Sequence, residues 1–350
     1  MKPLHGLKVL DFTRVLAGPY CTAMLAENGA DIIKIEPQTG DDYRHIGPFS
    51  EEGPSALFEK VNSGKRSIML DLAKHDDLKI ALSLAVTADV VVENFRPGVA
   101  AKLGIGFSTL QGLNPKLIYA SISGFGQTGD MAKRPAYDII VQAMSGIMAV
   151  TGHPDGPPTL IGESIGDVTA GLFAYNAIMT ALYQRHSTGL GQHLDISMLE
   201  SMLQLQPLIA ARLNATRITP TRVGNRHALS APFGVFEAKD ASFVLAVLND
   251  KLFKSLADVL HQPDLFSNPL FASDPLRLRN EATLRAAIEN WSKNRSAAQA
   301  VEILVTAGIP AAEVLDAKQA QALARPKAQL APAPKLDEHG FEIRKNLWTK

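Results

Sequence analysis

Apolar runs rich in Val and Ile alternate with helical patterns along the first 130 residues, and this alternation limits the fold more than any other feature. Runs with strand character occupy 7–13, 31–37, 66–72, 88–95 and 116–124. Helical patterns such as "YCTAMLAENGA" and "HDDLKIALSLAV" lie between them. Apolar strands joined by helices form a mostly parallel sheet with both faces covered. We therefore expect an α/β protein with a Rossmann-like large domain.

The remaining sequence predicts a second, smaller domain. We expect the large domain to span 1–215 and a polar linker with Pro and Gly to span 216–228. Two short strands and several helices then predict a small α+β domain over 229–315. The Ala/Pro-rich residues 316–350 are expected to form a C-terminal return segment or tail.

Composition excludes several classes of function. Lys and Arg together number 35, as do Asp and Glu, so the chain has no net basic field for nucleic acid or an anionic membrane. A single cysteine excludes an intrachain disulfide, and the nine histidines show no metal-binding spacing. The apolar runs look too short to span a bilayer, and the N-terminus lacks the apolar segment of a signal peptide. A cytoplasmic protein without metal is expected.

Two loops after predicted strands have the composition of ligand-binding loops. "GFGQTG" (124–129) fits the dinucleotide pattern G-x-G-x-x-G, but Pro135 follows too soon for a full helix. We favour a glycine-rich loop close to another ligand. In "VENFRPG" (92–98), Arg96 is suited to a phosphate and Phe95 to stacking on a planar base. An ordinary loop with a solvated arginine is the alternative.

Asp167 in "IGESIGDVTAGL" (161–172) is the most informative acidic residue. One interpretation is structural: Ser164 caps the following helix and Asp167 completes a capping box. The other is catalytic, because glycines leave space beside a carboxylate that has no nearby cation in the sequence. Backbone N–H groups at a helix start would keep such a carboxylate ionised and available as a nucleophile.

An ordered series of fragments resembles the class III CoA-transferase family, which includes formyl-CoA and carnitine CoA-transferases and alpha-methylacyl-CoA racemases. The matching fragments cover most of residues 4–204. They are "LDFTRVLAGPYCTAMLAENGADIIKIE", "NSGKRSIMLDL", "ADVVVENFRPG", "LGIGFSTLQGLNPKLIYASISGFGQTG", "YDIIVQAMSGIMAVTG", "IGDVTAGLFA" and "TGLGQHLDISMLES". The "GNRH…PFGVFEAKD" region is similar to the start of the family's small domain.

The resemblance implies a CoA thioester as substrate and an interlocked homodimer, with no permanently bound cofactor. It places Asp167 at the catalytic aspartate, which would attack the thioester to form a mixed anhydride and then an aspartyl-CoA thioester. Glycine N–H groups, for example from "SGFG", would stabilise the oxyanions. The positions that match CoA contacts or flank the thioester are Val15, Leu70, Ala73, Asn94, Phe95, Arg96, Lys102, Gly124, Tyr137 and Asp138.

Four departures from the family pattern bear on activity. The racemases carry His where this chain has Tyr137, so a racemase-like isomerase is the less favoured alternative. Formyl-CoA transferases carry Gln at Leu16, and Leu16 predicts a less polar acyl pocket. Pro37 replaces a CoA-binding Arg of some members, and the divergence after about residue 315 leaves an inactive CoA-binding paralogue as a further alternative. The sequence does not identify the donor acyl-CoA or the acceptor acid.

Overall fold

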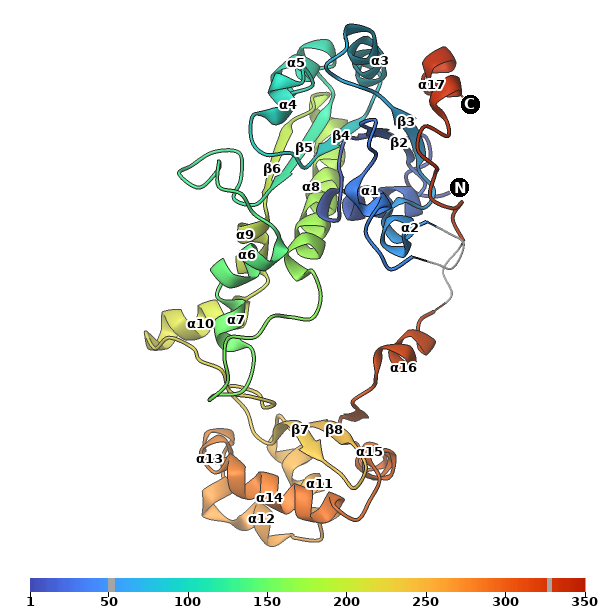
Figure 1. Cartoon of the computed structure of the whole chain (residues 1–350). Helices are drawn as coiled ribbons and strands as arrows, with labels where there is room; N and C mark the ends of the chain where they lie inside the picture. The colour runs from blue at the N-terminus through green and yellow to red at the C-terminus, as the bar shows by residue number, and fades with distance from the viewer. Residues whose placement is uncertain (50–53, 326–328, 350) are drawn as a thin grey trace. The chain divides into compact units, whose positions relative to one another are not determined.

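The computed structural model describes residues 1–49, 54–325 and 329–349, which divide into two compact units. Unit 1 contains 1–149, 160–220 and 329–349, and unit 2 contains 150–159 and 221–325. The C-terminal segment thus belongs to the same unit as the N-terminus, and both chain ends lie in unit 1 (Figure 1).

Unit 1 contains a parallel six-stranded sheet in the order β3-β2-β1-β4-β5-β6. This order confirms the expected Rossmann-like arrangement and places a reversal of strand order between β1 and β4. In such sheets, ligands bind beyond the carboxyl ends of the strands at that reversal. The strands are β1 Lys8–Asp11, β2 Asp31–Glu36, β3 Arg66–Met69, β4 Val90–Glu93, β5 Ile118–Ser123 and β6 His193–Ser197.

Helices cover both faces of this sheet, which explains the continuous apolar strands. Alternate strand residues such as Val9 and Val92 pack against α1 and α8, and the residues between them, such as Leu10 and Val91, pack toward α3 and α5. The helices of unit 1 are α1 Ala17–Glu27, α2 Ala56–Asn62, α3 His75–Val86, α4 Val99–Lys102, α5 Phe107–Leu113, α6 Asp138–Met144, α8 Ile165–Thr188, α9 Met198–Gln204, α10 Pro207–Thr216 and α17 Gly340–Asn346, with the short η1 at Asp42–Arg44; α7 Ile147–Val150 crosses the boundary between the units.

Helix α8 lies against α1, and a glycine permits the close approach (Figure 1). A Cβ on Gly171 would lie 2.7 Å from the carbonyl oxygen of Ala17, closer than real Cβ contacts occur. By length and composition α8 could cross a membrane, so the expectation that every apolar run is too short was wrong. Its apolar residues Ala174 and Ile178 are fully buried in the core, which explains the apolar composition without a membrane.

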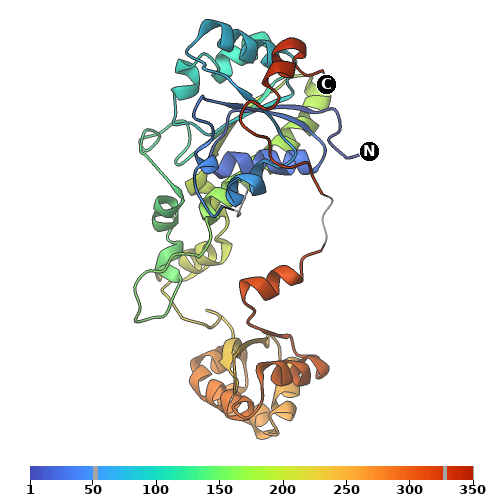
Figure 2. The same ribbon diagram turned by 45° about the vertical axis from the view of Figure 1, so that its right-hand side comes forward.

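The segment after residue 328 packs on the β3 edge of the sheet in unit 1 (Figure 2, red). Met69 N–H donates to the Asp337 carboxylate at 2.8 Å, and His339 N–H donates to the Ser67 carbonyl at 3.0 Å. Trp348 is buried and donates its indole N–H to the Leu84 carbonyl at 3.0 Å. The Ala/Pro-rich tail expected from the sequence therefore ends in an ordered return segment.

Unit 2 is built on an antiparallel three-stranded sheet in the order β7-β8-β9. Alternate residues of β7 and β8, including Phe236 and Phe243, are buried against helices α11, α14 and α15. The elements are β7 Phe233–Glu237, β8 Ser242–Ala246, β9 Ala311–Glu313, α11 Asp250–Val259, α12 Asp264–Ser267, η2 Pro269–Phe271, α13 Asp274–Arg279, α14 Glu281–Ser292, α15 Ala297–Thr306 and α16 Ala317–Ala322.

Candidate active site

Asp167 lies in the first turn of α8, and a carboxylate from another helix caps that turn. Asp138 Oδ1 accepts the N–H of Gly166 at 2.7 Å and that of Asp167 at 3.4 Å. The predicted capping box was wrong, because the Ser164 side chain makes no capping hydrogen bond and Ser164 N–H donates to Glu163 instead. Asp167 is therefore not needed as a cap, and its carboxylate is left for another role.

The Asp167 carboxyl has an unusual protonation equilibrium. Burial, assisted by the negative charge of Asp138, raises the pKa of Asp167 to about 7. The expectation that backbone N–H groups keep it ionised was wrong, because the first-turn amides donate to Asp138 rather than to Asp167. Within the described residues, no Lys or Arg forms an ion pair with Asp167. At neutral pH a large fraction is ionised, and that carboxylate is poorly solvated and basic.

Asp167 faces a cavity of about 170 Å³ beyond the carboxyl ends of β1, β4 and β5, which we call the inner cavity. Its lining includes Val15, Asn94, Phe95, Arg96, Gly124 and Tyr137, all from the predicted set. Gly124 is required for close packing, since a Cβ there would collide with the Ala136 Cβ. Tyr137 is 72% exposed and precedes α6, so its hydroxyl is accessible to a ligand.

The turn between β1 and α1 forms one wall of the inner cavity. Asn94 holds it from β4, accepting the Arg14 N–H at 3.0 Å and donating to the Arg14 carbonyl at 2.8 Å. Asp41 accepts the Val15 N–H at 2.9 Å. Asn94 thus lines the cavity, and its amide group holds this turn.

The "VENFRPG" loop is supported from below by a buried acid. Glu93, the last residue of β4, is 3% exposed and accepts the Phe95 N–H at 2.8 Å. Burial raises the pKa of Glu93 to about 7 against the opposing hydrogen bonds from Ser121 and Phe95. This bond fixes the Phe95 backbone where its ring lines two cavities.

The second cavity, of about 370 Å³, lies beyond β2, β3 and β4, and we call it the outer cavity. The predicted residues Leu70, Ala73 and Phe95 line it, together with Pro37 and Leu103. Its apolar walls are of the kind that accept a planar ring. Lys102 ends α4 next to Leu103 and is exposed.

Four further residues belong to this region and were missed in the sequence. Arg14 lines both cavities and Arg134 lines the inner one. Asp41 is fully buried behind the turn. Burial and the charges of Asp167 and Asp41 raise the pKa of Tyr43, so its phenol stays protonated near these carboxylates. Arg14 directly follows β1, so the rule that ligands lie beyond carboxyl strand ends would have found it.

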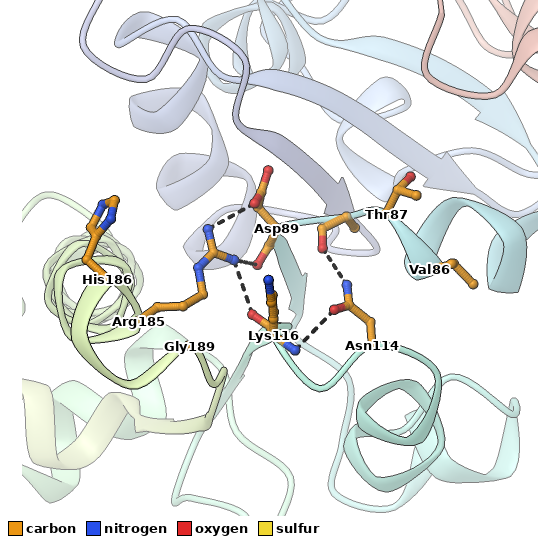
Figure 3. A pocket seen from close by; sticks show the side chains of 9 residues that line it. Val86, Thr87, Asp89, Asn114, Lys116, Arg185, His186 and Gly189 are labelled. Atoms are coloured by element: carbon orange, nitrogen blue, oxygen red, sulfur yellow. Dashed lines mark hydrogen bonds and ion pairs between the residues drawn. The ribbon is translucent and has the colours of Figure 1, made fainter.

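A larger hollow of about 540 Å³ lies at the opposite, amino edge of the sheet (Figure 3). There Arg185 donates to the Asp89 carboxylate at 2.9 Å and to the carbonyls of Asp89 and Lys116. Asn114 donates to the Ala88 carbonyl at 2.8 Å. These side chains complete backbone hydrogen bonding and neutralise one another, so we interpret this hollow as structural.

Neither a metal nor a dinucleotide finds its usual motif in the described residues. No group of three or more His, Cys, Asp or Glu in the parts of the chain that the structure describes could hold a metal ion. No helix begins within "GFGQTG", since the next helix is α6 at Asp138. A pyrophosphate therefore has no helix start at this loop.

Comparisons with known proteins identify the family of this chain. The family model described as "CoA-transferase family III" matches residues 4–337. An acetyl-CoA:oxalate CoA-transferase of Acetobacter aceti is 43% identical, covering 99% of this chain and 96% of the relative. A succinyl-CoA:mesaconate CoA-transferase of Haloarcula hispanica is 39% identical, covering 90% and 81%. The crystal structure of a CAIB/BAIF family protein from Brucella suis matches with a TM-score of 0.87 at 35% identity, covering 99% of both chains.

Proposed function

Since the chain belongs to CoA-transferase family III and is a CoA-transferase, we propose that it acts through Asp167 as a covalent nucleophile. The observation that carries this proposal is the carboxylate without a cation partner, facing a cavity and with its pKa raised to about 7. A structural carboxylate is normally paired or hydrogen-bonded in its ionised form. Asp167 is instead held in position by its backbone, which leaves its oxygens to the substrate.

The proposed reaction has four steps, each of which conserves charge. Ionised Asp167 attacks the acyl carbonyl of the thioester and CoA thiolate leaves, which gives a mixed anhydride. The thiolate attacks the aspartyl carbonyl and releases the first carboxylate, which gives an aspartyl-CoA thioester. The acceptor carboxylate displaces CoA thiolate to form a second anhydride. The thiolate then attacks the new acyl carbonyl and frees Asp167.

The start of α1 supplies donors for the tetrahedral oxyanions. First-turn N–H groups of a helix have no intrahelical acceptor, and Ala17, the first residue of α1, lines the inner cavity with Asp167. The close packing at Gly171 brings α1 and α8 together at this point. We assign the Ala17 N–H, together with that of Gly124 in the same cavity, to oxyanion stabilisation.

Coenzyme A fits the two cavities in a defined direction. The thioester belongs in the inner cavity with Asp167, and the adenine ring belongs between the apolar walls of the outer cavity. Arg14 and Arg96 lie where phosphates would pass between them. Lys102 on α4 is exposed for a further phosphate contact.

We propose a dicarboxylic acid as one of the two acids exchanged. The inner cavity carries Arg14, Arg96 and Arg134. Of the two aspartates that line it, Asp42 pairs with Arg14 at 3.4 Å, so the charges of Arg96 and Arg134 remain for a second carboxylate of the substrate. The two relatives are named for oxalate in one case and for succinyl-CoA and mesaconate in the other. Oxalate, succinate and mesaconate are all dicarboxylates. Acetyl-CoA and succinyl-CoA donors assayed against mono- and dicarboxylates will test it, and equal rates with monocarboxylates of matched length would contradict it.

A homodimer is the proposed assembly. Exposed apolar residues gather on α6, α9 and α10, which is unusual for a free surface. They are Ile139, Ile140, Leu203, Leu208 and Leu213. The interlocked arrangement is proposed from the family resemblance, and light scattering with Leu208→Glu as the variant will test whether this surface is an interface.

The decisive experiment traps the covalent intermediate. Incubation with acyl-CoA followed by hydroxylamine should convert Asp167 to a hydroxamate, which peptide mass spectrometry can locate. Asp195→Asn provides the control, because Asp195 is exposed and accepts the N–H of Gln127. A label on another residue, or full exchange activity in Asp167→Asn, would overturn the proposal.

A further inference from the structure

Charged side chains are buried directly behind the turn between β1 and α1. Lys34 and Asp41 are both 0% exposed, and their charged groups lie 2.8 Å apart. Asp11 and Lys65 form a second fully buried pair at 2.9 Å. A buried ion pair is weak support for stability, because desolvation of the two charges offsets their attraction. These pairs therefore call for another explanation, and their contacts with the turn supply one.

Three consecutive residues of the turn are each bound by a side chain from a different segment. Lys34 donates to the Thr13 carbonyl at 2.6 Å, and Asp41 accepts the Val15 N–H at 2.9 Å. Between them, Asn94 makes its two hydrogen bonds to Arg14. Contacts from β2, from the residue before η1 and from the residue after β4 thus converge on these three residues.

Val15 needs such support because its backbone is strained. Its φ is +67°, a left-handed conformation that a β-branched residue rarely adopts. Residues persist in this region only where the surrounding structure over-determines them. Val15 also lines the inner cavity, and Ala17 in the same cavity starts α1 two residues later. The strained conformation therefore sets where the first amides of α1 lie relative to Asp167.

We propose that Asp41 is a positioning residue, which holds the Val15 amide and so places the start of α1 over the carboxylate of Asp167. Asp41 is among the residues around the outer cavity but not the inner one. It is fully buried, and it is anchored on its other side by Lys34 and by the Tyr43 N–H at 3.0 Å. Its effect on the reaction passes through the backbone of Val15. This inference rests on the proposed role of Asp167 as the reacting group.

A matched pair of double variants isolates the hydrogen bond from the charge. Lys34→Met/Asp41→Asn and Lys34→Met/Asp41→Leu both remove the ion pair, but only Asn retains an acceptor for the Val15 N–H. We expect kcat of the Leu variant to be about 10- to 100-fold below that of the Asn variant, with KM for acyl-CoA changed less than about threefold. Equal kcat values in the two variants would overturn the proposal.

Two further measurements keep the test decisive if a double variant does not fold. In the wild-type protein, hydrogen exchange at Val15 should be strongly slowed, and exchange as fast as in an exposed loop would overturn the proposal. Asp250→Asn removes the partner of the buried Arg277 in unit 2 and should lower Tm without changing kcat. Retained activity in Asp167→Asn would reject the proposed function alone, because the exchange measurement does not depend on the chemistry.

Discussion

Acidic residues at the amino ends and at the carboxyl ends of the strands in the six-stranded sheet differ in their partners. We call these two sides of the sheet its amino edge and its carboxyl edge. At the amino edge, Asp89 pairs with Arg185 at 2.9 Å and also accepts the Lys8 N–H (Figure 3). At the carboxyl edge, Asp167 and Glu93 have no cation partner among the residues described, and burial raises the pKa of each to about 7. The charges at the amino edge are satisfied internally, whereas Asp167 at the carboxyl edge faces a cavity that a ligand can enter.

Whether the acidic residues of a hollow have cation partners distinguishes a structural hollow from a reactive one better than its volume does. The amino-edge hollow is larger, at about 540 Å³ against about 170 Å³ for the inner cavity. Its polar groups bind one another, so a ligand would have to compete with existing hydrogen bonds. The inner cavity contains Asp167, which has no ion-pair partner in the part of the chain that the structure describes, and also Arg96 and Arg134. A substrate would complete this arrangement.

The same substitution at each edge should have opposite effects. Asp167→Asn removes the nucleophile and should lower kcat by about 10³-fold or more, with unchanged or higher Tm at pH 8 because a poorly solvated charge is lost. Asp89→Asn should leave kcat within about twofold. Steady-state CoA transfer followed by chromatography of the CoA esters measures both. A loss of activity in Asp89→Asn as large as in Asp167→Asn would break the comparison.

The titration of Asp167 should appear in the pH dependence of the rate. Only the ionised carboxylate attacks, so kcat/KM should rise about tenfold per pH unit below pH 7 and level off above it. With a pKa of about 7, kcat/KM should change about 50-fold between pH 5 and pH 7. A rate profile that is flat from pH 5 to pH 8 would contradict the role given to Asp167.

The same pKa sets the sign of the pH effect on stability. In the unfolded chain the Asp167 carboxyl titrates near 3.8, so between about pH 4 and pH 7 the folded state binds more protons than the unfolded state. This residue therefore lowers the free energy of unfolding as the pH rises, by a few kcal/mol at most. Urea unfolding of Asp167→Asn should show a weaker decline over that range.

The close packing of α1 and α8 should be sensitive to a single methyl group. Gly171→Ala places a Cβ 2.7 Å from the Ala17 carbonyl and should push the helices apart, which lowers kcat by about 10-fold or more. Gly162→Ala is the matched control, because a Cβ there meets nothing within 4 Å. Similar kcat values for the two variants would show that the helix spacing does not matter to the reaction.

Removal of one positive charge from each edge should show whether KM for acyl-CoA depends on a local contact or on the overall surface charge. Arg96→Ala at the inner cavity should raise KM for acyl-CoA about 10-fold, with the effect reduced by added salt. Lys116→Ala at the amino edge should leave KM unchanged, since Lys116 is exposed there. An equal rise in KM for both variants would indicate long-range attraction rather than a phosphate contact.

The smallest effect is expected on the stability of the protein when Asp89, the paired acid of the amino edge, is replaced. Asp89→Asn leaves Arg185 without its counter-charge but with its two carbonyl acceptors. The free energy of unfolding should fall by about 1–2 kcal/mol, which lowers Tm by a few degrees. A calorimetric Tm equal to that of the wild type would show that this ion pair contributes nothing measurable.

The sheet of unit 1 was predictable because each of its strands is a local apolar run. The five strands expected before residue 125 all occur, and their alternation with helices indicated parallel pairing. The three-residue strand β9 Ala311–Glu313 was missed, since it owes its conformation to pairing with β8 rather than to its own sequence. The return of the C-terminal segment to β3 is likewise a long-range contact that local patterns do not encode.

That the candidate residues lie close together was predictable, but their electrostatics was not. The residues expected to contact CoA follow strand ends, so a parallel sheet brings Val15, Asn94 and Gly124 to the same cavity. The cap on α8 was mispredicted because its acceptor, Asp138, lies 28 residues away in sequence. Asp41 was overlooked because its importance comes from burial and from one bond to Val15, neither of which the sequence displays.

The return segment has a consequence for the order in which the protein is made. Strand β3 is at the edge of the sheet, and residues 337–339 occupy its exposed backbone groups. Residues 337–339 follow unit 2 in the sequence, so β3 is translated, and its edge stays uncovered, before the residues that cover it are made. An open strand edge is a template for pairing with other chains. Nascent chains that stall before residue 337 should therefore be the form of this protein most prone to aggregation.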